Sequence, residues 1–256
     1  MTSSAPVIVV GAASGIGFAT AQRLHRDGGA VVLADLDGAA AAQRAADLGA
    51  NATAVAVDVT DEQSVSALFE SVLAEHGHPR GVVNSAGMSS AGAIADMSLD
   101  DWNATISVCQ TGAFLMLKYA SRYVADAGSI VTIASLNGRQ PAPGMAAYCT
   151  AKAGVLMLTE VAAMELGGRG VRVNAISPGL VDTPLVEPVA LIPGMREEYL
   201  ENTPLGRSGR PEEIAAMAQF LLSGDASWIT GAAFDVNGGA HTRRYPDLLK
   251  RLAALA

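Results

Sequence analysis

Basic charge is scarce in this sequence, and long apolar runs are missing. The 256 residues include 17 Lys and Arg against 25 Asp and Glu, a net charge of −8, so the basic field that captures nucleic acid is lacking. No apolar run approaches the ~20 residues of a membrane-spanning helix. The first residues also lack the pattern of a secretion signal. We therefore expect a cytoplasmic protein whose partners are neither nucleic acid nor membrane.

Cysteine is rare too, and the histidines are not grouped. Two cysteines, Cys109 and Cys149, are too few for a disulfide scaffold and are expected to be reduced thiols. The four histidines lack carboxylate or cysteine partners at metal-ligand spacing, so no metal site is expected. Half of the residues are apolar and 16% are charged, a composition that favours a packed globular core.

What the sequence does contain is an alternation of short β-branched runs with longer helical segments. Strands are expected at residues 7–10, 30–34, 54–57, 81–84, 129–133, 171–176 and 232–236. Helices are expected at residues 15–25, 39–48, 62–75, 98–124, 145–166 and 211–222. Apolar strands separated by helices indicate a parallel sheet covered on both faces. The fold class is therefore α/β: one domain over residues 1–256, with a doubly wound, Rossmann-type sheet of about seven strands.

A glycine-rich turn follows the first strand, with Gly11, Ser14, Gly15, Ile16 and Gly17 at the start of a helix. Glycine allows the backbone to approach a pyrophosphate, and a helix N-terminus offers free N–H groups to it. Alone, such a turn also fits a simple strand-to-helix connection.

An acidic residue ends the second strand and strengthens the nucleotide interpretation. Asp35, followed by Leu36, is placed to accept hydrogen bonds from the adenosine ribose hydroxyls and to repel a 2′-phosphate. No Arg or Lys occupies the glycine turn or the few residues after Asp35. NAD is therefore expected in preference to NADP.

Tyr148 and Lys152 lie four residues apart, on one face of a predicted helix. A neighbouring ammonium favours the phenolate and so lowers the tyrosine pKa, which makes the phenol usable as an acid or base near neutral pH. Ser135 ends the preceding strand, at the edge of the sheet where ligands bind.

In this order and spacing the residues resemble the short-chain dehydrogenase/reductase family, over essentially the whole chain. The matching motifs are the Gly11/Gly15/Gly17 turn, Asp58-Val59, Asn84-Ser85-Ala86-Gly87, Ser135, Tyr148/Lys152, residues 174–179, residues 181–183 and residues 237–239.

The resemblance implies a role for each group of residues. Tyr148 would exchange a proton with the substrate oxygen, Lys152 would also hold the nicotinamide ribose, and Ser135 would hydrogen-bond the substrate oxygen. The implied cofactor contacts are Gly11, Ser14, Gly15, Ile16, Gly17, Asp35, Leu36, Asp58, Val59, Asn84, Ala86, Gly87, Tyr148, Lys152, Pro178, Gly179, Val181 and Thr183. The family also implies a homotetramer, with the helices around Cys109 and Tyr148 between subunits.

The pattern departs from the family at Cys109, where a fourth catalytic residue is usually Asn. That Asn is thought to bind a water that connects the lysine to solvent. A thiol is a weak donor and acceptor, so the relay is expected to be altered, with Ser107 or Gln110 as substitutes. Val10 and Ser85 are milder departures.

Two segments near the end are expected to shape the substrate site. Residues 183–210 are broken by proline and form a candidate lid. Its apolar residues are expected to contact an apolar substrate, or to be buried against the core or a neighbouring subunit. Residues 240–256 form a tail whose basic and leucine residues predict a short helix that packs on another protomer.

Three functions follow. The first is an NAD(H)-dependent oxidoreductase that transfers a hydride between nicotinamide and a secondary alcohol or ketone. The second is an NADPH-dependent 3-oxoacyl-thioester reductase, against which Asp35 counts. The third, supported by Cys109, is a catalytically silent NAD-binding sensor or scaffold.

Overall fold

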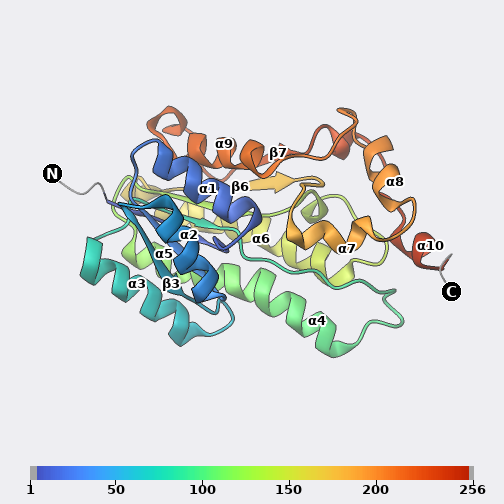
Figure 1. Cartoon of the computed structure of the whole chain (residues 1–256), viewed down its shortest axis with the longest axis horizontal. Coiled ribbons are helices and arrows are strands. Elements are labelled where there is room, and N and C mark those ends of the chain that lie inside the picture. Colours follow the sequence, from blue (N-terminus) through green and yellow to red (C-terminus); the bar gives the residue numbers. More distant parts are fainter. Residues whose placement is uncertain (1–4, 254–256) are drawn as a thin grey trace.

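The computed structural model describes residues 5–253 and places them around one sheet (Figure 1). The strands are β1 (Val7–Val10), β2 (Val31–Asp35), β3 (Ala52–Ala56), β4 (Gly81–Asn84), β5 (Ser129–Ile133), β6 (Arg172–Pro178) and β7 (Ala233–Val236). Their order across the seven-stranded sheet is β3-β2-β1-β4-β5-β6-β7, and neighbouring strands are parallel. The expected doubly wound sheet is confirmed.

Helices connect the strands and mostly begin where the sequence indicates. They are α1 (Gly15–Arg26), α2 (Gly38–Leu48), α3 (Glu62–His76), α4 (Leu99–Ile106), α5 (Gly112–Tyr123), α6 (Ala146–Leu166), α7 (Glu187–Ala190), α8 (Met195–Glu201), α9 (Pro211–Leu222) and α10 (Leu248–Ala253). Side chains of Asp37, Asp61 and Ser98 accept hydrogen bonds from first-turn N–H groups of α2, α3 and α4. Within the described residues, no helix has the length and apolarity needed to cross a bilayer.

One predicted helix differs from the structure. Residues 98–124 were expected to form a single helix, but a π-helical turn, Ser107–Thr111, separates α4 from α5. Such turns insert one extra residue into a helix and are frequent at functional sites. Cys109 lies in the middle of this turn and is buried.

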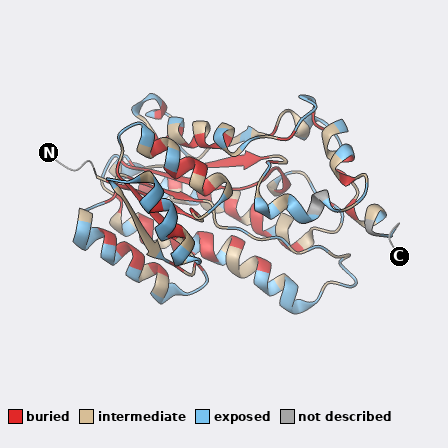
Figure 2. Ribbon diagram, in the orientation of Figure 1, coloured by how far each residue is buried: buried red, intermediate tan, exposed pale blue. Residues whose placement is uncertain are grey.

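The sheet sends alternate side chains into two apolar cores, as strand geometry requires. In β1, Ile8 and Val10 join a core with residues of α3, α5 and α6. Val7 and Val9 point to the opposite face, toward α1, α2 and α9. Figure 2 shows the sheet and the helix faces turned toward it as the buried part of the molecule. Both faces are therefore covered, which explains why the strands are mostly apolar.

The strand order reverses at β1, which lies between β2 and β4. In doubly wound sheets the crevice at the carboxyl ends of such strands binds ligands. Gly11 follows β1, Asp35 ends β2 and Asn84 ends β4, while Ser135 lies just beyond β5. The residues singled out by the sequence thus gather at one edge of the sheet.

Candidate active site

The turn between β1 and α1 forms a backbone cradle. Gly11 and Gly15 have φ values of +74° and +53°, in the left-handed region that favours glycine. A Cβ on Gly17 would lie 2.0 Å from the carbonyl oxygen of Gly11, so only glycine fits there. Ser85 Oγ donates to the carbonyl of Val10 at 2.6 Å and fastens the turn to the segment after β4. Exposed backbone at a helix N-terminus suits a pyrophosphate, so the residues fit a dinucleotide.

A groove with about 1100 Å³ of empty space runs from this turn toward Asp35. Among the predicted cofactor residues, its walls contain Gly11, Ser14, Gly15, Ile16, Gly17, Asp35, Leu36, Asp58, Val59, Ala86, Gly87 and Thr183. They also contain residues that the motifs did not single out as cofactor contacts: Val10, Val57, Ser85, Met88, Val108, Pro184 and Leu185.

The other six predicted cofactor residues lie away from these walls, and two of them, Tyr148 and Lys152, belong to the cluster at β5. Asn84 is buried, and its Oδ1 accepts from the Ala86 N–H at 3.2 Å, so it orders the loop that forms the wall. Val181 is buried too. Pro178 and Gly179 line a neighbouring pocket.

The Asp35 carboxylate is held in place where β2 reaches the groove. Its Oδ2 accepts from the Ala13 N–H at 2.9 Å, and its Oδ1 from the Asp37 N–H at 3.0 Å. One cationic side chain lies closer to the glycine turn than the sequence suggested. Arg44 donates from Nε to the carbonyl of Ala13 at 3.3 Å and stacks on Phe18. The fold thus brings the positively charged Arg44 side chain from α2 to the glycine turn.

Ser135, Tyr148 and Lys152 come together at the carboxyl end of β5. Ser135 Oγ donates to Asn137 Oδ1 at 3.4 Å, and Ser135 lies close enough to Tyr148 to lower the pKa of its phenol. Lys152 is 4% exposed, and its Nζ donates to the carbonyl of Ile133 at 2.8 Å. The same Nζ lies 5.6 Å from the centroid of the Tyr148 ring. Helix α6 therefore presents the phenol and the ammonium side by side, as their spacing predicts.

Burial dominates the acid–base properties of this group. Withdrawal of the Tyr148 hydroxyl from water raises its pKa, and the effect of Ser135 only partly offsets the rise. Burial likewise lowers the pKa of Lys152. In the protein by itself the net shift of the Tyr148 pKa is therefore upward, because desolvation outweighs the effect of Ser135. That Lys152 lowers this pKa stays a prediction.

Cys109 lies beside the lysine. A Cβ on Gly87 would be 3.8 Å from Lys152 Nζ and 3.9 Å from Cys109 Sγ. The thiol donates to the carbonyl of Met88 at 3.1 Å and accepts from its N–H at 3.3 Å. Cys109 thus ties the π-helical turn to the loop after β4. Gln110 is turned toward Gly154 of α6.

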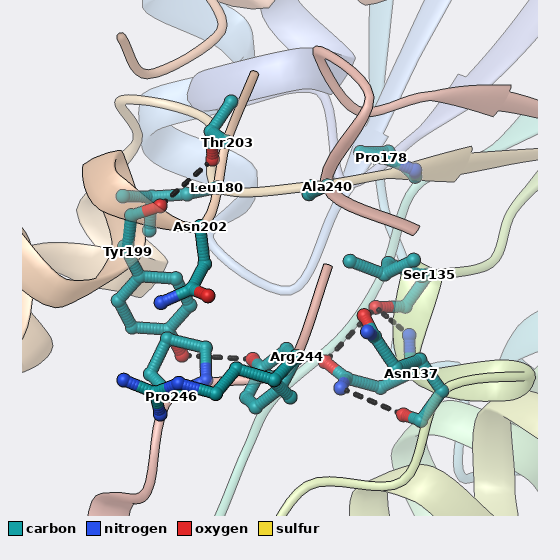
Figure 3. A pocket seen from close by; sticks show the side chains of 14 residues that line it. Ser135, Asn137, Pro178, Leu180, Tyr199, Asn202, Thr203, Ala240, Arg244 and Pro246 are labelled. Atoms are coloured by element: carbon teal, nitrogen blue, oxygen red, sulfur yellow. Dashed lines mark hydrogen bonds between the residues drawn. The ribbon is translucent and has the colours of Figure 1, made fainter. Parts of the chain in front are cut away.

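A second pocket opens beyond Ser135 (Figure 3). Its walls come from the segments after β5 and β6, from α8 and the turn after it, and from the tail. They are Ser135, Leu136, Asn137, Gln140, Pro178, Gly179, Leu180, Tyr199, Asn202, Thr203, Ala240, Arg244, Tyr245 and Pro246. It has about 340 Å³ of empty space, part of it open to solvent.

The tail contacts its own chain. That its helix also packs on another protomer stays a prediction. The hydroxyls of Tyr245 and Tyr199 are 2.8 Å apart, and Tyr245 also reaches Met145 Sδ at 3.7 Å. Arg244 Nη1 donates to Glu198 at 2.7 Å. The sequence places Arg244 in a basic tail, but it does not predict that Arg244, Tyr199 and Tyr245 line the site. No local pattern links residues almost fifty positions apart.

Comparison with known proteins agrees with this geometry. The family model described as enoyl-(acyl carrier protein) reductase matches residues 11–241. The chain is 41% identical to cis-4-hydroxycyclohexanecarboxylate dehydrogenase of Sinomonas cyclohexanicum, over 91% of this chain and 94% of that protein. It is 35% identical to 3-oxoacyl-[acyl-carrier-protein] reductase FabG of Thermotoga maritima, over 91% and 96%.

A solved structure resembles the whole chain. The short-chain type dehydrogenase/reductase from Mycobacterium ulcerans superposes with a TM-score of 0.93 at 33% identity, covering 100% of this chain and 96% of that one. The chain therefore belongs to the short-chain dehydrogenase/reductase family. It is an oxidoreductase of the kind that acts on CH–OH groups with a nicotinamide cofactor.

Proposed function

We propose that the protein transfers a hydride between NAD(H) and a secondary alcohol or ketone, with Tyr148 as the general acid and base. The observation that carries the proposal is the position of buried Lys152, whose Nζ lies 5.6 Å from the centroid of the Tyr148 ring, with Ser135 close enough to lower the Tyr148 pKa. When bound, nicotinamide supplies the hydride donor or acceptor.

Each side chain has a defined task in this proposal. Ser135 holds the substrate oxygen and stabilises its developing charge. Tyr148 gives that oxygen a proton in reduction and takes it in oxidation. Lys152 keeps donors beyond its bond to Ile133 for the ribose hydroxyls. Asp58 and Val59 would meet the adenine.

The remaining cofactor contacts follow the strand ends. Asn84 to Gly87 would border the adenosine ribose, and Pro178 to Thr183, through Gly179 and Val181, would hold the carboxamide. Residues 183–210 would act as a lid within a single domain over residues 1–256.

NAD(H) is the proposed cofactor because the Asp35 carboxylate is fixed where a 2′-phosphate would lie. Arg44 favours the alternative, an NADPH-dependent 3-oxoacyl-thioester reductase, because it adds positive charge beside Ala13. Titrating Asp35→Ala and wild type with NADH and NADPH separates the two. We expect wild type to prefer NADH and Asp35→Ala to lose most of that preference; a wild-type preference for NADPH would favour the alternative.

Catalytic silence is the second alternative, and Cys109 is the observation behind it. The thiol already uses its donor on Met88, so it has little left for a water relay. Nucleotide binding without turnover of any alcohol or ketone would favour a silent NAD-binding protein.

We also propose a homotetramer. Phe114 of α5 and Met157, Val161 and Met164 of α6 are exposed, and the last three share one helix face. Exposed apolar patches of this kind mark association sites. Analytical ultracentrifugation should show Met164→Glu to be smaller than wild type and than a control, Leu191→Glu. A monomeric wild type would contradict the assembly.

We also propose a cytoplasmic location, with which the two free thiols are consistent.

The reaction is tested by following NADH absorbance while wild type is offered NAD⁺ and a panel of compounds. The panel includes 4-hydroxycyclohexanecarboxylate, plain secondary alcohols and 3-hydroxyacyl thioesters. Turnover of at least one compound, lowered about 10²- to 10⁴-fold in Tyr148→Phe, supports the proposal. An inactive wild type, or an unchanged Tyr148→Phe, refutes it.

A further inference from the structure

The second pocket has a single charged group in its wall. Among the 14 residues of the described chain that line it, only Arg244 is charged. The others are apolar, hydroxyl or amide residues. Figure 3 shows the Arg244 side chain beside Pro246 on the Tyr199 side of the pocket, with Ser135 on the opposite side.

Arg244 is anchored by an acidic residue that is almost fully buried. Glu198 is 5% exposed. Its Oε1 accepts from Arg244 Nη1 at 2.7 Å, and its Oε2 accepts from Arg251 Nε at 2.8 Å. One carboxylate is therefore shared by two guanidinium groups, and a positive charge is left over. The neighbouring Asp247 carboxylate accepts from the Lys250 N–H.

The guanidinium of Arg244 keeps donors for another acceptor. Of its three nitrogens, Nη1 alone makes a hydrogen bond in the described structure, and its side chain is 62% exposed. A guanidinium holds its five N–H groups in a fixed, planar fork. Two parallel N–H groups of this fork match the two oxygens of a carboxylate.

We propose that Arg244 is the anchor for a carboxylate on the substrate. The pocket then takes a compact hydroxy acid or keto acid whose acid group binds Arg244 while its alcohol or ketone carbon reaches Ser135 and Tyr148. This assignment of substrate class rests on the proposed function. Arg244 is thus a specificity-determining residue, and Glu198 positions it.

The test compares an acid with its uncharged amide. Turnover of 4-hydroxycyclohexanecarboxylate and of its carboxamide is measured for wild type and Arg244→Gln. Loss of one charge-assisted contact should lower kcat/KM for the acid by about 10- to 100-fold and leave the amide nearly unchanged. Arg251→Gln and Arg243→Gln are matched controls. Arg251 shares Glu198 and Arg243 is the exposed neighbour in sequence, yet neither lines the pocket.

A binding measurement keeps this inference separate from the proposed reaction. Cyclohexanecarboxylate has no hydroxyl to oxidise, so its affinity for the NADH complex, measured by calorimetry, does not depend on turnover. Binding that weakens about 10- to 100-fold in Arg244→Gln alone supports the anchor. Equal loss in Arg251→Gln, or equal effects on acid and amide, would overturn it, even in an active enzyme. Absence of all turnover would refute the reaction and leave the binding result to decide the anchor.

Discussion

Glu198→Gln tests whether one buried carboxylate holds the tail over the substrate pocket. Burial by itself would raise the pKa of Glu198, but hydrogen bonds from Arg251, Arg244 and the Asp247 N–H together lower it to about 2. The fall from the ordinary 4.5 is worth roughly 3 kcal/mol, at about 1.4 kcal/mol for each pH unit. Arg244 and Arg251 are 62% and 38% exposed, so solvent screening reduces this to about 1–3 kcal/mol.

Losing that energy should let the tail open more often. The bond after Arg244 is a trypsin site, and the next residues, Tyr245 and Pro246, are half-buried and buried. Because about 1.4 kcal/mol is tenfold in an opening equilibrium, cleavage after Arg244 should be about 5- to 100-fold faster in Glu198→Gln. Trypsin digestion followed by intact mass measures this rate, with the exposed neighbour Glu197→Gln as the control.

The pH dependence of the ion pairs between Glu198 and the tail has a defined sign. A carboxyl with a lowered pKa stabilises the folded state above its unfolded pKa, and that stabilisation is lost as pH falls from about 4.5 toward 2. Protection of the tail in wild type should therefore not change between about pH 6 and 9. Cleavage of Glu198→Gln at the wild-type rate would refute the claim that Glu198 holds the tail in place.

Three further predictions concern the active site. Cys109→Asn should raise kcat while nucleotide affinity stays the same. Cys109→Ala removes both hydrogen bonds to Met88 and should lower the free energy of unfolding by about 1–3 kcal/mol. Unchanged urea unfolding of the alanine variant would contradict this. Gly17→Ala should lose nucleotide binding, measured by calorimetry, because its Cβ would lie 2.0 Å from the Gly11 carbonyl oxygen. Since burial raises the Tyr148 pKa, kcat/KM for alcohol oxidation should rise from about pH 7 to 10, while ketone reduction, which uses the protonated phenol, should not; a fall in oxidation over this range would count against Tyr148 as the base.

The sheet and the nucleotide groove were predictable because their signals are local. A strand buried on both faces is expected to be apolar, and β1 is apolar throughout. Gly17 is fixed by one close backbone contact within its own turn. The division of the 98–124 helix by a π-helical turn was not predictable, because its residues keep a helical pattern on both sides of Cys109.

The substrate pocket was hidden for a different reason. Arg244 and Tyr245 reach it only because Glu198 and Tyr199, 46 residues earlier in each case, bind them. No spacing rule announces a contact of that range. The spacing of Tyr148 and Lys152 did predict a shared helix face, but it carried no information on burial, which decides the direction of both pKa shifts.

Paired measurements on Tyr148→Phe test the central claim most directly, that a phenol beside Lys152 exchanges the substrate proton over a bound dinucleotide. The account predicts that this variant still binds NADH while kcat falls by about 10²- to 10⁴-fold, the usual contribution of general acid–base catalysis. A variant that binds NADH equally well and keeps the wild-type kcat would contradict it.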